Sequence, residues 1–146
     1  MAARSYEIDA TEGRIAVRLV GPLDESQTAS ILEGVTEALS NLENPQVIFD
    51  LDRVTDSTLL GRAKLIELQE LLASFGGRTV WMSRRPRFRG MALVVCHAAH
   101  DPNAKVVSTP EQAERWFRST TDRIFDAHKP VDAGLAKIRA GRKAKR

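Results

Sequence analysis

Three consecutive residues with side-chain oxygens, Asp56, Ser57 and Thr58, stand between a short apolar segment and a long amphipathic one. Carboxylate and hydroxyl oxygens at such a junction accept hydrogen bonds from the first free backbone N–H groups of a helix, so one interpretation is a helix cap at Ser57 or Thr58. The N-terminus of a helix also carries a partial positive charge, which favours a phosphate group. The junction therefore predicts a helix cap, a hydroxyl suited to carry phosphate, or both together.

A second concentration of charge lies in one short segment of the chain. It consists of four arginines and one phenylalanine: Arg84, Arg85, Arg87, Arg89 and Phe88. Guanidinium groups bind phosphates and carboxylates, and an aromatic ring among them can stack on a base. We expect a loop over residues 83–90 that binds a phosphate, an acidic partner or nucleic acid, with a merely solvated loop as the alternative. A phosphate on Ser57 would be one such anion.

Cys96, His97 and His100 are the next group with metal-ligand chemistry. Cys96 and His100 would share one face of a helix, but two ligands do not make a site, and no second cluster of cysteine and histidine supplies the others. Ser57, His97 and Asp56 offer a hydroxyl, an imidazole and a carboxylate, yet no nucleophile elbow, P-loop or glycine-rich dinucleotide turn accompanies them. We therefore expect no metal, no cofactor and no enzymatic activity.

The spacing of apolar residues predicts the elements that position these side chains. Apolar residues alternate with polar ones in the strands and recur at steps of three and four in the helices, and one continuous run at 47–49 is typical of a strand buried on both faces. Leu60, Trp81 and Trp116 are expected to face the core. The expected order is strands at 6–10 and 14–20, a helix at 26–42, a strand at 47–51, a helix that ends at Gly76-Gly77, a strand at 78–82, a helix at 91–99, a strand at 105–107 and a last helix at 110–125.

Strands separated by helices of this length pair in parallel and are joined by right-handed crossovers. The sequence thus predicts an α/β fold with a mixed, mainly parallel sheet, a hairpin of the first two strands at one side, and a cover of about four helices. In such a sheet, the loops that follow the carboxyl ends of the strands lie at one edge, where sites form. We expect the Asp56-Ser57-Thr58 junction and the arginine segment to meet at that edge.

The composition fits one domain in a reducing compartment. A chain of 146 residues with 42% apolar content can bury a core without disulfide bonds or structural metal ions. Cys96 is the only cysteine, so no internal disulfide forms, and neither a secretory signal nor an apolar stretch long enough for a bilayer is present. The expected location is the cytoplasm, with no contact to the membrane.

The C-terminal segment 126–146 has a charge of its own, with seven lysines and arginines against two aspartates. We expect a domain over residues 1–125 followed by a basic, flexible tail. A charged tail of this kind can contact polyanions such as nucleic acid, although solvated tails are the commoner case.

Four short segments follow one another in a set order along the chain. They are Gly21-Pro22-Leu23-Asp24, Ile48-Phe49-Asp50-Leu51 with Val54, Asp56-Ser57-Thr58, and Thr109-Pro110-Glu111-Gln112-Ala113. The first three are similar to the G-x-L-D, D-L-S-x-V and D-S-S-G motifs of the STAS family, the domain of bacterial anti-sigma factor antagonists and of the cytoplasmic ends of sulfate transporters. The fourth is similar to a helix start near the end of that domain. The resemblance covers residues 6 to about 120 and implies the STAS fold.

The resemblance also implies a regulatory role without catalysis. In antagonists of the family, a serine directly after the aspartate is phosphorylated by an anti-sigma kinase, and the phosphate decides whether the two proteins bind. On this chain, the acceptor would be Ser57, with Thr58 as the alternative, and the partner an anti-sigma or serine kinase-like protein or another signalling protein. A phosphate adds about 1.5 to 2 negative charges, which can create or abolish a contact. The implied docking edge consists of Asp24, Asp56, Ser57, Thr58 and Leu59.

Two residues depart from the family pattern, since Leu59 stands where a glycine is usual and Thr55 where an apolar residue is usual. Some members of the family keep the fold and lose phosphorylation, so two other functions stay open. One is an adaptor that binds polyanions or nucleic acid through the Arg84 to Arg89 segment and the basic tail. The other is a STAS-like scaffold subunit of a larger assembly, in which Ser57 is only a helix cap.

Overall fold

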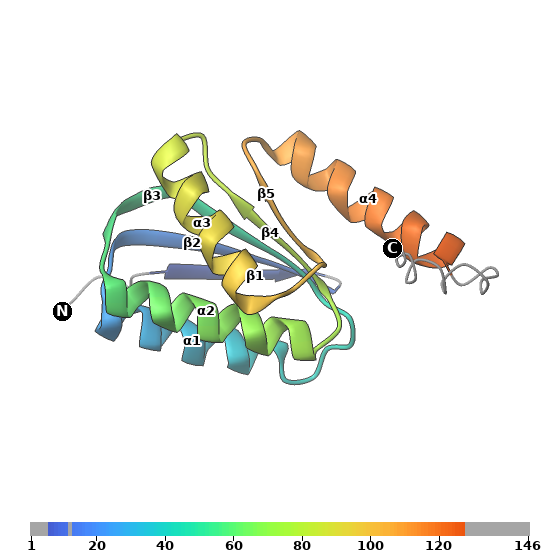
Figure 1. Cartoon of the computed structure of the whole chain (residues 1–146). Helices are drawn as coiled ribbons and strands as arrows, with labels where there is room; N and C mark the ends of the chain where they lie inside the picture. Colours follow the sequence, from blue (N-terminus) through green and yellow to red (C-terminus); the bar gives the residue numbers. More distant parts are fainter. Residues whose placement is uncertain (1–5, 12, 128–146) are drawn as a thin grey trace. The chain divides into compact units, whose positions relative to one another are not determined.

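The computed structural model describes residues 6–11 and 13–127, with side chains up to residue 118 (Figure 1). Two strands open the chain, and helices then alternate with strands in the predicted order. The elements are β1 (Tyr6–Thr11), β2 (Arg14–Leu23), α1 (Glu25–Leu39), β3 (Gln46–Ser57), α2 (Leu59–Ser74), β4 (Arg78–Met82), α3 (Pro86–Ala99), β5 (Ala104–Val107) and α4 (Pro110–Ala127).

The chain divides into two compact units, Met1–Glu114 and Arg115–Arg146. The first unit contains the sheet, α1 to α3 and the beginning of α4, and the second contains the remainder of α4. Trp116 is half-buried rather than a core residue. The helix ends at Ala127 instead of Phe125, and the expected basic tail after it lies outside the described residues. None of the helices described is both long enough and apolar enough to cross a bilayer.

The sheet has five strands in sequence order, and the predicted α/β fold with a mixed sheet is confirmed. β1 and β2 form the expected antiparallel hairpin, and the other neighbouring strands pair in parallel. The pairing of β3 with β4 ends where Asp50 lies opposite Met82, whereas its pairing with β2 continues until Ser57 lies opposite Leu23. β3 therefore runs beyond its predicted end at residue 51. Asp56 lies in this extension, near the carboxyl end of the strand.

Three helices, α1, α2 and α3, cover the same face of the sheet (Figure 1). The strands are added in one direction only, so crossovers of a single hand place successive helices on one side. Buried and exposed residues accordingly alternate along residues 15–19 of β2. The expected burial of the 47–49 run on both faces is wrong for the same reason: Val47 and Phe49 are buried, but Ile48 is only half-buried.

One polar side chain is enclosed in the core beneath α2. Gln69 is fully buried; its Oε1 accepts a hydrogen bond from Nε1 of Trp81 at 2.7 Å, and its Nε2 donates to Oδ2 of Asp101 at 2.7 Å. Trp81 is fully buried, as predicted, and stacks on Phe49 with the ring centroids 4.2 Å apart. These contacts join α2 to β4 and to the turn after α3, and thereby fix the positions of α2 and α3.

Candidate functional site

The junction after β3 gives its polar residues different roles. Thr58 is the N-cap of α2: its backbone is extended, with φ −105° and ψ 166°, and its Oγ1 accepts the N–H of Gly61 at 3.0 Å. The N–H of Thr58 itself donates to the carbonyl oxygen of Leu23 at 3.1 Å. Of the two residues considered for the cap, the structure therefore selects Thr58, and Ser57 is the last residue of β3.

The start of α2 lies in direct contact with the end of β2. A Cβ atom on Gly61 would lie 2.0 Å from the carbonyl oxygen of Leu23, far inside van der Waals contact. Leu59, by contrast, is 74% exposed. The backbone therefore has room for a side chain at Leu59, where the family pattern has glycine. The position that excludes a side chain is Gly61, where α2 approaches the backbone of β2.

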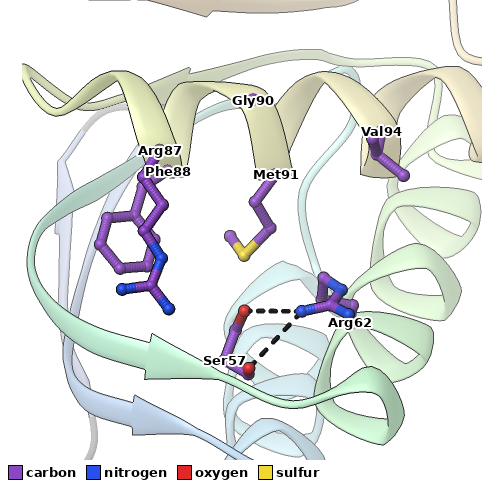
Figure 2. A pocket seen from close by; sticks show the side chains of 7 residues that line it. All are labelled: Ser57, Arg62, Arg87, Phe88, Gly90, Met91 and Val94. Carbon is purple, nitrogen blue, oxygen red and sulfur yellow. Dashed lines mark hydrogen bonds between the residues drawn. The ribbon is translucent and has the colours of Figure 1, made fainter.

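Ser57 is half-buried at the rim of an open pocket between α2 and α3 (Figure 2). Its Oγ accepts a hydrogen bond from Nη1 of Arg62 at 3.0 Å. The pocket has a volume of about 240 Å³, and its lining combines Ser57 and two arginines, Arg62 and Arg87, with apolar side chains of α3 that include Phe88, Met91 and Val94. A group attached to the Ser57 hydroxyl would thus meet a guanidinium.

Asp56 holds the second arginine of the pocket. Its Oδ1 accepts hydrogen bonds from Nη2 of Arg87 at 2.7 Å and from the backbone N–H of Ser57 at 2.8 Å. Both side chains of the ion pair are well exposed, Arg87 at 67% and Asp56 at 63%. Solvent screening limits an exposed pair to less than about 1 kcal/mol, so Arg87 can exchange this partner for another.

Asp24 lies beside the junction because Leu23 pairs with Ser57 across the β2–β3 ladder. It is the N-cap of α1, and its Oδ1 accepts the N–H of Gln27 at 2.9 Å. The carboxylate is half-buried and faces the start of its own helix. The residues of the expected docking edge are thus neighbours, and their role in binding stays a prediction.

The arginine segment is mainly helical, so the expected loop over residues 83–90 is wrong. α3 begins at Pro86 rather than at Met91. Proline fits the first position of a helix, and it holds the preceding Arg85 in an extended conformation, with φ −95° and ψ 121°. Only residues 83–85 remain as a loop.

Arg85 stabilises the fold at the point where β4 ends. Its Nη2 donates to the carbonyl oxygen of Leu51 at 2.8 Å and also to that of Val54. Both acceptors belong to the part of β3 that extends beyond its ladder with β4, so the guanidinium supplies the donors that a neighbouring strand would have supplied. The guanidinium also lies over the ring of Phe88, 4.4 Å from its centroid.

The other arginines of the segment point to separate partners. Arg89 donates to a backbone carbonyl oxygen at 3.1 Å. Arg84 is exposed, and its backbone N–H donates to a carboxylate at 2.9 Å. A joint anion site of the four arginines gains no support from this geometry. The pocket instead combines Arg87 with Arg62, which stands one helical turn after Thr58; that spacing is the signal by which sequence reasoning could have found it.

Large apolar side chains are exposed on both helices of the site. They are Leu59 at 74%, Leu60 at 57%, Leu93 at 59% and Val94 at 59%. The expectation that Leu60 faces the core is wrong, because the buried face of α2 runs through Gly61, Leu65 and Leu68. Leu59 follows the cap of α2 and Val94 of α3 lines the pocket, so both helices beside Ser57 carry exposed apolar groups.

The cysteine and histidines of α3 do not form a ligand set. Cys96 is half-buried, and burial together with the nearby Asp101 carboxylate raises the pKa of its thiol to about 12. His100 ends the helix in the left-handed conformation, with φ 56° and ψ 39°, and His97 is exposed. Throughout the part of the chain that the structure describes, histidine, cysteine and acidic side chains form no group of three that could hold a metal ion.

No model of a protein family and no curated protein matches the chain. Solved structures do match its fold. An anti-sigma factor antagonist from Mycobacterium paratuberculosis is 18% identical, with 77% of this chain and 92% of that chain covered and a TM-score of 0.60. A sulfate transporter family protein from Wolinella succinogenes is 17% identical, with 78% and 92% covered and a TM-score of 0.60. The Bacillus cell fate determinant SpoIIAA in its phosphorylated form is 18% identical, with 75% and 96% covered and a TM-score of 0.55.

These identities are too low to carry a function from one protein to another, but the coverage of most of each chain establishes the architecture. The resemblance inferred from the motifs is confirmed at that level: this chain has the STAS fold of the anti-sigma factor antagonists.

Proposed function

We propose that the chain is a non-enzymatic regulatory STAS domain that binds a protein partner and that phosphorylation of Ser57 switches this binding. The binding edge consists of Asp24, Asp56, Ser57, Thr58 and Leu59. The partner is a signalling protein of the anti-sigma factor or serine kinase type. Support comes from the structures that share the fold, which include an anti-sigma factor antagonist and a protein solved in a phosphorylated form.

The observation that carries the proposal is the separation of roles between Ser57 and Thr58. Thr58 caps α2, whereas the Oγ of Ser57 is bonded to the side chain of Arg62 at the rim of an open pocket. A hydroxyl that satisfies no backbone group can be modified without opening the helix start. The exposed Leu59 beside it offers apolar area of the kind that partner surfaces cover.

The other two functions considered differ from this proposal in measurable ways. A polyanion adaptor draws no support from the arginine segment, since Arg85 and Arg89 are bonded to backbone carbonyl oxygens within the fold. A scaffold subunit would bind its partners regardless of the state of Ser57.

The first arm of the test asks whether Ser57 is a kinase substrate. The wild type, Ser57→Ala and Thr58→Ala are incubated with ATP and an extract of the source cells, and phosphate is located by mass spectrometry. We expect phosphate on residue 57 in the wild type and in Thr58→Ala, and none in Ser57→Ala. Phosphate on other residues alone would overturn the proposed acceptor.

The second arm asks whether the modification controls binding. The wild type and Ser57→Asp serve as baits in the same extract, and the bound proteins are compared. A signalling partner that binds one bait and not the other supports the switch. An identical set of partners on both baits would refute it and favour the scaffold.

A further inference from the structure

The pocket beside Ser57 holds guanidinium groups whose acceptors are weak or replaceable. Arg62 donates from Nη1 to the Oγ of Ser57 at 3.0 Å and, at the longer distance of 3.5 Å, to its carbonyl oxygen. Arg87 enters the pocket from α3 (Figure 2). Its guanidinium is held by the exposed carboxylate of Asp56. A hydroxyl accepts less strongly than an oxyanion, and a guanidinium has five N–H donors in a fork that matches phosphate. Both arginines therefore line the pocket beside Ser57 with donor capacity to spare.

The surroundings of the pocket strengthen any charge interaction inside it. Its apolar wall includes Phe88 and Met91, which are 2% and 8% exposed. Low polarity on one side reduces screening by water, so ion pairs there are stronger than on an open surface. The N-terminus of α2, a helix of 16 residues, begins two positions after Ser57 and adds a partial positive charge.

We propose that this pocket is a receptor, within the same chain, for a phosphoryl group borne on Ser57. The phosphate oxygens accept a bidentate hydrogen bond from the guanidinium of Arg62. Arg87 leaves Asp56 and binds the same phosphate. This inference rests on the proposed function in supposing that Ser57 is phosphorylated. In that step the Ser57 oxygen bonds to the γ-phosphorus of ATP, the bond from that phosphorus to the ADP oxygen breaks, and the hydroxyl proton passes to a base of the kinase.

The receptor explains how one phosphate could change the docking edge without unfolding it. A dianion held by Arg62 and Arg87 leaves the carboxylate of Asp56 without its guanidinium partner. The edge then presents a carboxylate without its guanidinium partner and a neutralised pocket, where it had presented an ion pair and an unmodified hydroxyl bonded to Arg62. A partner that had docked an acidic group on the unmodified edge would then meet like charge and lose its contact.

The orientation of the phosphate can be measured through its second ionisation. A phosphoserine that points into solvent beside the Asp56 carboxylate would have a pKa at or above the ordinary value of about 6, because a like charge disfavours the dianion. A phosphoserine bound by two guanidinium groups would have a pKa lower by about 1 pH unit or more. The pKa of the phosphoserine therefore distinguishes a phosphate in solvent from a phosphate bound in the pocket.

The test uses the whole 146-residue chain with phosphoserine incorporated at position 57 during translation, and the pKa is read from the ³¹P chemical shift as a function of pH. We expect a pKa about 1 pH unit below that of a phosphoserine peptide. Arg62→Gln should return it to the peptide value or above, and Arg62→Lys should leave it between the two. Arg84→Gln is the matched control, because that exposed arginine lies outside the pocket, and it should change nothing.

A pKa at or above the peptide value in the wild type would overturn the receptor, as would an Arg62→Gln variant that folds normally and titrates like the wild type. Thermal unfolding of each variant establishes that it is folded. Because phosphoserine is introduced without a kinase, this result does not depend on whether a kinase recognises Ser57. The receptor and the proposed function can therefore fail separately.

Discussion

Replacing Gly61 by alanine tests the contact that places the start of α2 against β2. The added Cβ would lie 2.0 Å from the carbonyl oxygen of Leu23 and 2.8 Å from its carbonyl carbon. Both atoms are backbone, so a rotamer change cannot relieve the overlap. Forced overpacking of this kind costs up to about 3 kcal/mol, and alanine recovers about 1 kcal/mol of helix propensity relative to glycine. We expect Gly61→Ala to lower the free energy of unfolding by about 2 kcal/mol, measured by urea denaturation.

The chain supplies two controls on other helices. Gly90 lies in α3 with nothing within 4 Å of an added Cβ, so Gly90→Ala should raise the free energy of unfolding by about 0.5–1 kcal/mol. At Gly34 in α1 the nearest atom is the Tyr6 hydroxyl at 2.4 Å, the end of a movable side chain, and Gly34→Ala should fall between the other two variants. If Gly61→Ala were as stable as the wild type while Gly90→Ala behaved as expected, the close approach of α2 to β2 would be refuted.

Four further substitutions test the core, the cap and the thiol. Gln69→Leu removes the acceptor of the buried Trp81 Nε1 and should destabilise the fold by about 2–3 kcal/mol in urea denaturation, and an unchanged midpoint would contradict the buried network. Thr58→Ala should lower the free energy of unfolding by about 1 kcal/mol, and Ser57→Ala should lower it clearly less. The reverse order would show that Ser57 rather than Thr58 caps α2. Folding raises the pKa of the Cys96 thiol to about 12. The folded chain therefore keeps the thiol proton, whereas the unfolded chain releases it from about pH 9 upward. Stability should therefore decrease as the pH rises from about 9 toward 12, and Cys96→Ala should flatten that slope in urea denaturation at several pH values.

The order of strands and helices could be predicted because each element buries one face and therefore shows a clear period. The extension of β3 could not, since beyond Asp50 it pairs only with β2 and its residues are mostly exposed. Half of a strand without a second neighbour has little apolar alternation to detect. The early start of α3 was missed for a related reason: charged residues in the first turn of a helix resemble a loop, and Pro86 alone indicated the boundary.

The candidate site was predictable where a motif names consecutive residues and not where partners come from different elements. Asp56, Ser57 and Thr58 follow one another in the sequence, so their junction was found. The pairing of Arg87 with Asp56 joins α3 to β3 across 31 positions, and no local pattern contains it. The arginine segment looked like one anion site because its side chains are close in sequence. Helical geometry and the end of β4 direct Arg85 and Arg87 to different acceptors.

Leu59 departs from the motif at a position where its side chain does not alter the fold. It is the first residue of α2 and 74% exposed, so its side chain strains no backbone contact. Under the proposed function, we expect the kinase that modifies Ser57 to bind the exposed leucine two residues away as part of its recognition site. We expect Leu59→Gly to lower stability by less than about 1 kcal/mol, yet to slow phosphorylation of Ser57 in source-cell extract several-fold. Leu60→Gly, at a position 57% exposed, is the control for lost apolar area. Equal rates in both variants and the wild type would show that Leu59 takes no part in recognition.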